Sequence, residues 1–207
     1  MNKEPDYIKD ISEIRNIMER SSRFMSLSGL SGVMAGIYAL IGAFLAYRLF
    51  YFSDEILYRT ISRGALSGKV LNLMLLALSV LVLAIGTGIW LSHLKAKKHN
   101  YKMWDATAKR MIVNLAIPLV TGGIFVLIMF SKGLIGLIAP CTLIFYGLSL
   151  INASKYTYTD IRYLGFCEIV LGLLSSYYIG FGLLFWAIGF GLLHIVYGTV
   201  MYFKYEK

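Results

Sequence analysis

Glu168 and His194 are the residues of this chain whose types and placement could carry chemistry. Glu168 stands inside the hydrophobic run from Tyr163 to Ile179, and His194 stands inside the next run, from Phe181 to Phe203. A charge at the centre of a membrane helix costs roughly 2.5–3.5 kcal/mol, so this pair requires a physical reason. A carboxyl group and an imidazole can share a proton, and burial disfavours the charged form of either.

The spacing of the two runs predicts that the pair is in contact. Their connection turns near Gly180 and is almost absent, which predicts a tight antiparallel hairpin. Glu168 then lies at the depth of residue 192, about 3 Å along the helix axis from His194. Each lies on a stripe of small residues, the face that favours close helix packing. The stripes consist of Gly165, Gly172 and Ser175, and of Ala187, Gly191 and Gly198. We predict that the two stripes pack together and that Glu168 and His194 form a direct hydrogen bond.

Two interpretations of the pair remain open at this point. As a structural contact, it would be an interhelical hydrogen bond worth about 0.6–2 kcal/mol that sets the register of the hairpin. As a functional site, it would bind a proton or a cation. Transport sites usually gather several polar groups, and the candidates to accompany the pair are Asn114, Thr87 and Tyr146.

Two prolines interrupt other hydrophobic runs. Pro118 removes the hydrogen bond to the carbonyl of residue 114, and Pro140 does the same for residue 136, so we expect both helices to be kinked or locally open. Paired interrupted helices can mark the substrate site of a transporter. They are also common in membrane bundles that transport nothing.

The composition places these residues in a membrane protein. Hydrophobic residues make up 58% of the chain and charged residues 15%, against roughly 45–50% and 25% in soluble domains. Long uninterrupted apolar runs that lack period-two alternation predict helices, which satisfy their own backbone in lipid. We therefore predict an all-α bundle of six transmembrane helices. The spans are 24–47, 70–91, 111–130, 134–153, 163–179 and 181–203.

The distribution of Lys and Arg predicts the orientation. Fifteen of the twenty fall on the side of the two termini, and an excess of positive charge marks the cytoplasmic side. We therefore expect a multi-pass protein of the cytoplasmic membrane, in contact with lipid, with both termini inside and a short tail at 204–207. The segment 48–69 carries four of the remaining five charges and is left unplaced.

Residues 1–23 precede the first span. Their pattern of apolar and charged residues predicts a cytoplasmic amphipathic helix over residues 6–20. Its apolar residues share one face, and they are Tyr7, Ile11, Ile14 and Met18. Its charges balance, whereas helices that bind lipid surfaces are rich in Lys and Arg, so packing on protein is favoured. The helix could pack on the bundle of its own chain, on another copy of the chain in a homo-oligomer, or on a partner protein.

The charge distribution and the Cys and His spacing argue against a nucleic-acid-binding protein and against a metal or cofactor site. The net charge of +9 follows the topology rule, and no separate basic domain exists, so no nucleic-acid partner is expected. No Cys or His spacing is typical of a metal site, and we expect no cofactor. The leading hypothesis is a non-enzymatic interaction or regulatory component, and the alternative is a small-molecule or ion transporter or channel that uses Glu168 and His194.

A short motif in the first span is similar to a protease signature. The run Gly29-Leu30-Ser31-Gly32 resembles the GxSG motif of rhomboid intramembrane proteases, and His194 with Gly198 is similar to their histidine helix. The resemblance implies a serine and histidine dyad. It covers about ten residues, the order of the helices differs from that family, and the family's tryptophan-arginine loop motif has no counterpart. An intramembrane hydrolase using Ser31 therefore stays a distant alternative.

The stretches EIRNIMERSSRFMSLSGLSG and LIFYGLSLINASKY resemble a group of uncharacterised bacterial membrane proteins with six spans. This resemblance implies the six-span fold and carries no activity with it.

Overall fold

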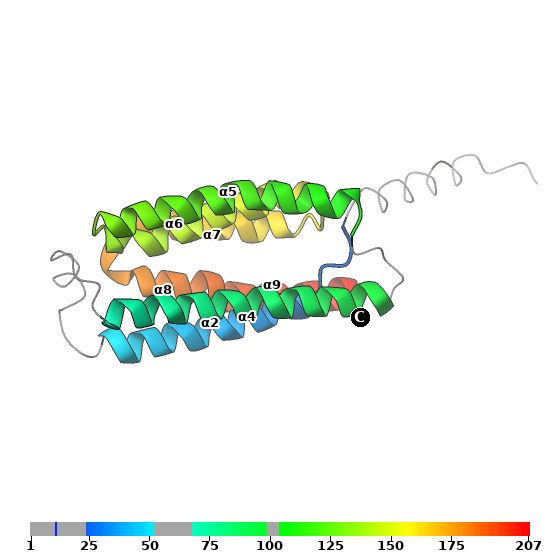
Figure 1. Ribbon diagram of the computed structural model, residues 1–207. Helices are drawn as coiled ribbons and strands as arrows, with labels where there is room; N and C mark the ends of the chain where they lie inside the picture. Colours follow the sequence, from blue (N-terminus) through cyan, green and yellow to red (C-terminus); the bar gives the residue numbers. More distant parts are fainter. Residues whose placement is uncertain (1–10, 12–23, 52–67, 99–103) are drawn as a thin grey trace, which may run out of the picture.

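The computed structural model describes residue 11 and residues 24–51, 68–98 and 104–207 (Figure 1). Within these ranges the chain is helical and contains no strand, which confirms the predicted all-α bundle. The predicted helix over 6–20 and most of the segment 48–69 lie outside the described residues. Ile11 is helical and 64% exposed.

The helices follow one another along the chain with short connections. In chain order they are α2 (Gly29–Ala46), η1 (Tyr47–Tyr51), α4 (Gly68–Lys98), α5 (Ala106–Ser131), η2 (Ile135–Leu137), α6 (Ile138–Ala153), η3 (Ser154–Tyr156), α7 (Ile161–Tyr177), η4 (Ile179–Phe181), α8 (Gly182–Trp186), η5 (Ala187–Leu193) and α9 (His194–Tyr205). The last predicted span is thus a succession of segments, of which η5 is a π-helix.

The described helices of the bundle form two layers (Figure 1), one with α5, α6 and α7 and the other with α2, α4 and the α8–α9 segment. In one layer α6 lies between α5 and α7, and in the other α2 lies between α4 and the α8–α9 segment. The layers meet where α8 contacts α6 and α7 and where η5 contacts α7. The seam between the layers therefore lies beside η5.

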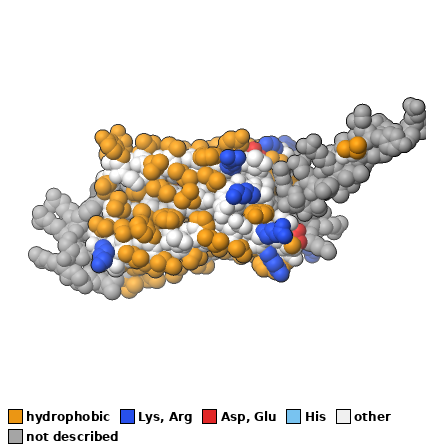
Figure 2. Space-filling model, turned by 90° about the horizontal axis from the view of Figure 1, so that it is seen from above, with side chains coloured by type: hydrophobic (Ala, Val, Ile, Leu, Met, Phe, Trp, Pro, Cys, Tyr) orange, Lys and Arg blue, Asp and Glu red, His pale blue; other side chains and the backbone are white. Residues whose placement is uncertain are grey.

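Among the described residues, five helical segments are long and apolar enough to cross a membrane. They are Gly29–Leu49, Leu71–Lys98, Ala106–Ser131, Ile135–Tyr156 and Ile179–Tyr205. The fifth predicted span corresponds to α7, which has 17 residues. Large hydrophobic side chains of α4 and α5 cover the outside of the bundle, and Figure 2 shows apolar side chains along the length of the face that it draws. The chain therefore has the architecture of a multi-pass membrane protein.

Local sequence signals fix both ends of α5. Asp105 accepts a hydrogen bond from the backbone N–H of Ala108 at 2.6 Å and caps the first turn. At the other end Gly133 has a φ of 73°, and its N–H bonds to the carbonyl of Phe130. Only glycine adopts this left-handed conformation at no steric cost, and it is the usual way to end a helix.

Glycines bring the backbones together within each layer. A Cβ atom at Gly147 of α6 would lie 2.5 Å from the carbonyl oxygen of Gly165 of α7, and one at Gly198 of α9 would lie 2.5 Å from the backbone nitrogen of Val33 of α2. Gly191 faces the side chain of Leu40, also in α2. The prediction that the small-residue stripes of the last two spans pack together is therefore wrong. Each stripe packs instead on a central helix, α6 or α2.

The two prolines have different effects. Pro118 lies inside α5, and the side-chain amide of Asn152 in α6 donates to the carbonyl of Asn114 at 2.9 Å, so a second helix satisfies the acceptor that the proline frees. Pro140 is the third residue of α6. In the first turn a missing N–H loses no hydrogen bond of the helix, so Pro140 produces no kink inside α6. The helical geometry changes two residues before it, where the 3₁₀ segment η2 ends and α6 begins at Ile138.

Polar contacts gather at one end of the bundle. Glu206 accepts a hydrogen bond from the backbone N–H of Gly29, which starts α2, and lies 3.2 Å from the ammonium nitrogen of Lys95 in α4. Phe24 donates its N–H to the carbonyl of Tyr156 at 2.7 Å. Residue 24 and the C-terminus thus lie at the same end, which we call the C-terminal end. Lys and Arg gather toward it in Figure 2.

Candidate functional site

Glu168 of α7 and His194 of α9 meet across the seam between the layers. Glu168 Oε1 lies 3.5 Å from His194 Nδ1, and the side chain of Glu168 is 0% exposed. The contact predicted from the hairpin register is therefore present. Neither residue faces lipid, because the small-residue stripes of their helices hold them inside the bundle.

The hydrogen bonds of His194 differ from the prediction. Its Nδ1 lies 3.0 Å from the carbonyl oxygen of Gly189 and its Nε2 lies 2.8 Å from the hydroxyl of Tyr146. A carbonyl can only accept, so Nδ1 carries a hydrogen, and in the neutral ring Nε2 accepts from Tyr146. Both nitrogens are thus satisfied without Glu168. The predicted direct hydrogen bond is replaced by these two.

The carboxyl group of Glu168 is left without such a partner. Among the described residues neither of its oxygens has a hydrogen-bond partner. Its surroundings are apolar and tight, because a methyl group at Gly189 would lie 2.5 Å from Oε2 and 2.6 Å from Leu143, which is itself 0% exposed. A buried polar group without a hydrogen bond destabilises the fold, which is why such a group invites a functional explanation.

The π-helix η5 supplies the carbonyl that binds His194. It holds Gly189 and Gly191 two residues apart, and glycine is the weakest ordinary helix former. Single π-turns inside α-helices recur at functional sites. This segment was not predicted, and its only signal in the sequence is the pair of glycines in the middle of a span.

The geometry allows two arrangements of one shared proton. With the proton on Glu168 both side chains are neutral. With it on Nε2 of His194, the hydroxyl of Tyr146 accepts from Nε2 instead of donating to it, and the imidazolium and the carboxylate form an ion pair in which Nδ1 lies 3.5 Å from Oε1. Both arrangements are neutral overall. Loss of the proton leaves one negative charge in the seam, with no cation within the described contacts of Glu168. Such a charge is unfavourable in a low dielectric and attracts a proton or another cation.

The other predicted residues are distributed over the bundle. Tyr146 joins the pair, whereas the hydroxyl of Thr87 donates to the carbonyl of Leu83 and the amide of Asn114 to that of Arg110, within their own helices. The hydroxyl of Ser31 donates to the carbonyl of Ser28. No hydrogen bond joins Ser31 to His194, so the described residues do not assemble the dyad that the rhomboid resemblance implies.

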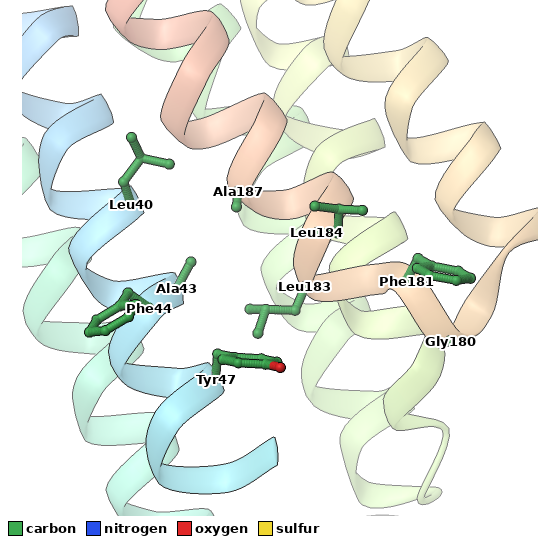
Figure 3. A pocket seen from close by; sticks show the side chains of 9 residues that line it. All are labelled: Leu40, Ala43, Phe44, Tyr47, Gly180, Phe181, Leu183, Leu184 and Ala187. Carbon is green, nitrogen blue, oxygen red and sulfur yellow. The ribbon is translucent and has the colours of Figure 1, made fainter. Parts of the chain in front are cut away.

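A separate cavity lies between α2 and α8, toward the end opposite the C-terminal end (Figure 3). Its volume is about 420 Å³ and its lining is apolar. The lining residues are Leu40, Ala43, Phe44, Tyr47, Gly180, Phe181, Leu183, Leu184 and Ala187. Glu168, His194 and Tyr146 do not line this cavity, so the cavity is separate from the buried pair.

Asp160 forms a second polar site just before α7, at the C-terminal end. Its Oδ2 accepts hydrogen bonds from the ammonium of Lys204 at 2.7 Å and from the hydroxyl of Tyr205 at 2.6 Å. Partial burial raises the pKa of Asp160, but these two hydrogen bonds outweigh it and hold the pKa below its ordinary value. Asp160 is therefore a carboxylate at neutral pH.

Comparison of the chain with protein-family models, with curated proteins and with solved structures gives no significant match. The function is therefore inferred from the geometry of this chain alone.

Proposed function

We propose that the protein is an ion-translocating membrane protein, a transporter or channel, in which Glu168 is the residue that gains and loses the transported or coupled ion. The observation that supports it best is the buried carboxyl group of Glu168, whose two oxygens have no hydrogen-bond partner among the described residues. An ionisable residue inside a membrane bundle is rare, and it usually marks an ion pathway or a proton relay.

His194 and Tyr146 are positioning residues in this proposal. Because His194 is held by Gly189 and Tyr146, its imidazole stays beside Glu168 in both protonation states. A purely structural contact would instead use the two side chains to satisfy each other. Deprotonation of Glu168 places charge between the two layers, and a charge there favours hydration of the seam over dry packing.

Proton flux into liposomes tests the proposal. Purified protein is reconstituted with a pH-sensitive dye inside, and a potassium diffusion potential drives protons inward. We expect wild-type liposomes to acidify and Glu168→Gln liposomes to match protein-free ones, because the amide cannot exchange a proton. Thr199→Val is the control, since its exposed hydroxyl donates only within α9, to the carbonyl of Ile195, and it should keep the wild-type rate. Equal rates for wild type and Glu168→Gln would contradict the proposal.

The competing hypothesis of an interaction component depends on residues 6–20, which lie almost entirely outside the described residues. Deletion of residues 1–20 distinguishes the interaction hypothesis from the transport hypothesis. Transport through the Glu168 site predicts that the deletion keeps the flux. If the full chain carries no flux, and the deletion abolishes self-association measured by sedimentation equilibrium in detergent, the interaction hypothesis replaces transport.

For the orientation, we propose that the C-terminal end faces the cytoplasm and that the membrane is the cytoplasmic membrane. The described Lys and Arg gather toward that end (Figure 2), and the positive-inside rule relates such an excess to the cytoplasm. Fluorescent protein fused after Lys207 should therefore be fluorescent, and alkaline phosphatase at the same position inactive. Active phosphatase would reverse the orientation.

A further inference from the structure

Tyr197 of α9, like Glu168, has a buried polar atom without a hydrogen-bond partner among the described residues. Its hydroxyl oxygen is buried and forms no hydrogen bond with any described residue. The ring packs against the core cluster that contains Ile161 and Leu164 of α7 and Met201 of α9. A tyrosine hydroxyl buried in such a place would ordinarily find a partner.

The register of α7 and α9 places Tyr197 between the two polar sites. Near the middle of the bundle Glu168 lies beside His194, and at the C-terminal end Asp160 bonds to Lys204 and Tyr205. Tyr197 is three residues beyond His194, about 4.5 Å along the helix axis toward that end. Leu164, a member of the cluster against which Tyr197 packs, is one turn before Glu168 on the buried face of α7.

The polar groups form a row along this seam. From the bundle centre toward the C-terminal end they are Glu168 with His194 and Tyr146, then Tyr197, then Asp160 with Lys204 and Tyr205. Tyr205 packs against the same core cluster as Tyr197, and Asp160 directly precedes Ile161, a member of that cluster. The side chains around Tyr197 are otherwise the apolar and aromatic members of the core cluster.

We infer that Tyr197 relays protons between Glu168 and the Asp160–Tyr205 pair, so that Glu168 exchanges its proton toward the C-terminal end of the bundle. This inference rests on the proposed function and names the proton as the ion. A monovalent metal ion would need several oxygen ligands, whereas Glu168 is packed against Leu143 and Gly189. In the relay, the Asp160 carboxylate first takes up a proton from water at the C-terminal end. Its new O–H bond then breaks as an O–H bond forms on the hydroxyl oxygen of Tyr197, and the original O–H bond of Tyr197 breaks as its proton moves to the Glu168 carboxylate. The tyrosine ends neutral, and rotation of the hydroxyl resets it.

The rate at which Glu168 responds to a pH step tests the relay. Infrared difference spectroscopy of the protein in lipid gives the carboxylic carbonyl band of Glu168, identified as the band that Glu168→Gln removes. We expect the band of Tyr197→Phe to reach the wild-type end point at least about tenfold more slowly, because the ring is kept and only the transferring hydroxyl is lost. Asp160→Asn, at the outer end of the row, should also slow it.

Tyr163→Phe is the matched control. Tyr163 lies on α7 and is 65% exposed, so removal of its hydroxyl should leave the rate unchanged. If Tyr197→Phe and Asp160→Asn both respond at the wild-type rate while Glu168→Gln abolishes band and flux, the relay is wrong and the proposed function stands. If Glu168→Gln changes neither band nor flux, the proposed function itself fails.

Discussion

Replacement of Glu168 by methionine is expected to make the folded protein more stable, by about 1–3 kcal/mol, while it abolishes the proton flux. The carboxyl group is 0% exposed and unpartnered among the described residues, so its removal relieves the penalty of a buried polar group. Methionine is flexible enough to fill the space beside Leu143 and Gly189. Unfolding by SDS titration measures the free-energy difference between the variant and the wild type.

Glu206 provides a control with the opposite expected sign. Its carboxylate accepts from the backbone N–H of Gly29 and from the hydroxyl of Ser28, and it pairs with Lys95. Glu206→Met should therefore destabilise the fold, by about 1.5–3 kcal/mol, because charged hydrogen bonds are lost. If Glu168→Met destabilises the protein as much as Glu206→Met does, Glu168 is a structural contact and the functional interpretation loses its support.

A stabilising loss of function would fit a general pattern. Residues at functional sites are often held in unfavourable surroundings, and the rest of the structure keeps them there. Here the close approach of Gly147 to Gly165 and of Gly198 to Val33 joins neighbouring helices within each of the two layers. The unfavourable carboxyl group lies between them, where a change of hydration affects the contact between layers and leaves the packing inside each layer intact.

The sequence predicts the depth of the pair better than its surroundings. Depth follows from the short turn near Gly180 and the fixed rise of a helix, so contact between Glu168 and His194 could be derived. The direction in which a small-residue stripe faces depends on a third helix that is distant in the chain. For that reason the packing of Gly198 on α2 was not predicted. The hydrogen bond from His194 to the carbonyl of Gly189 was not predicted either.

Other features depend on contacts that no local pattern encodes. Glu206 belongs to a four-residue tail in the sequence, yet it caps α2 from the other end of the chain. Pro118 frees the carbonyl of Asn114, as expected, but the amide of Asn152 that satisfies it comes from the neighbouring helix. The π-helix arises where two glycines weaken the α-helix and a histidine side chain competes for a backbone carbonyl.

Substitution of Gly198 by valine is expected to have the largest effect on stability, a loss of about 3 kcal/mol or more. A Cβ atom at this position would lie 2.5 Å from the nitrogen of Val33 and 2.6 Å from the carbonyl oxygen of Gly29. Both are backbone atoms of α2, so no side-chain rotation can relieve the clash and the two helices must separate. Close approach of this kind is what small residues provide in membrane bundles, where no hydrophobic force drives helices together.

Gly123→Val distinguishes this steric effect from the general effect of replacing a helical glycine. Gly123 lies in α5, and a Cβ atom there meets no atom within 4 Å, so the variant should unfold at the wild-type SDS concentration or slightly above it. Gly198→Val should unfold at a clearly lower concentration. Because α9 begins at His194, separation of α9 from α2 also moves the imidazole away from Glu168, and the flux should fall together with the stability. A Gly198→Val variant that unfolds like Gly123→Val would show that α2 and α9 are not in the close contact that holds His194 in the seam.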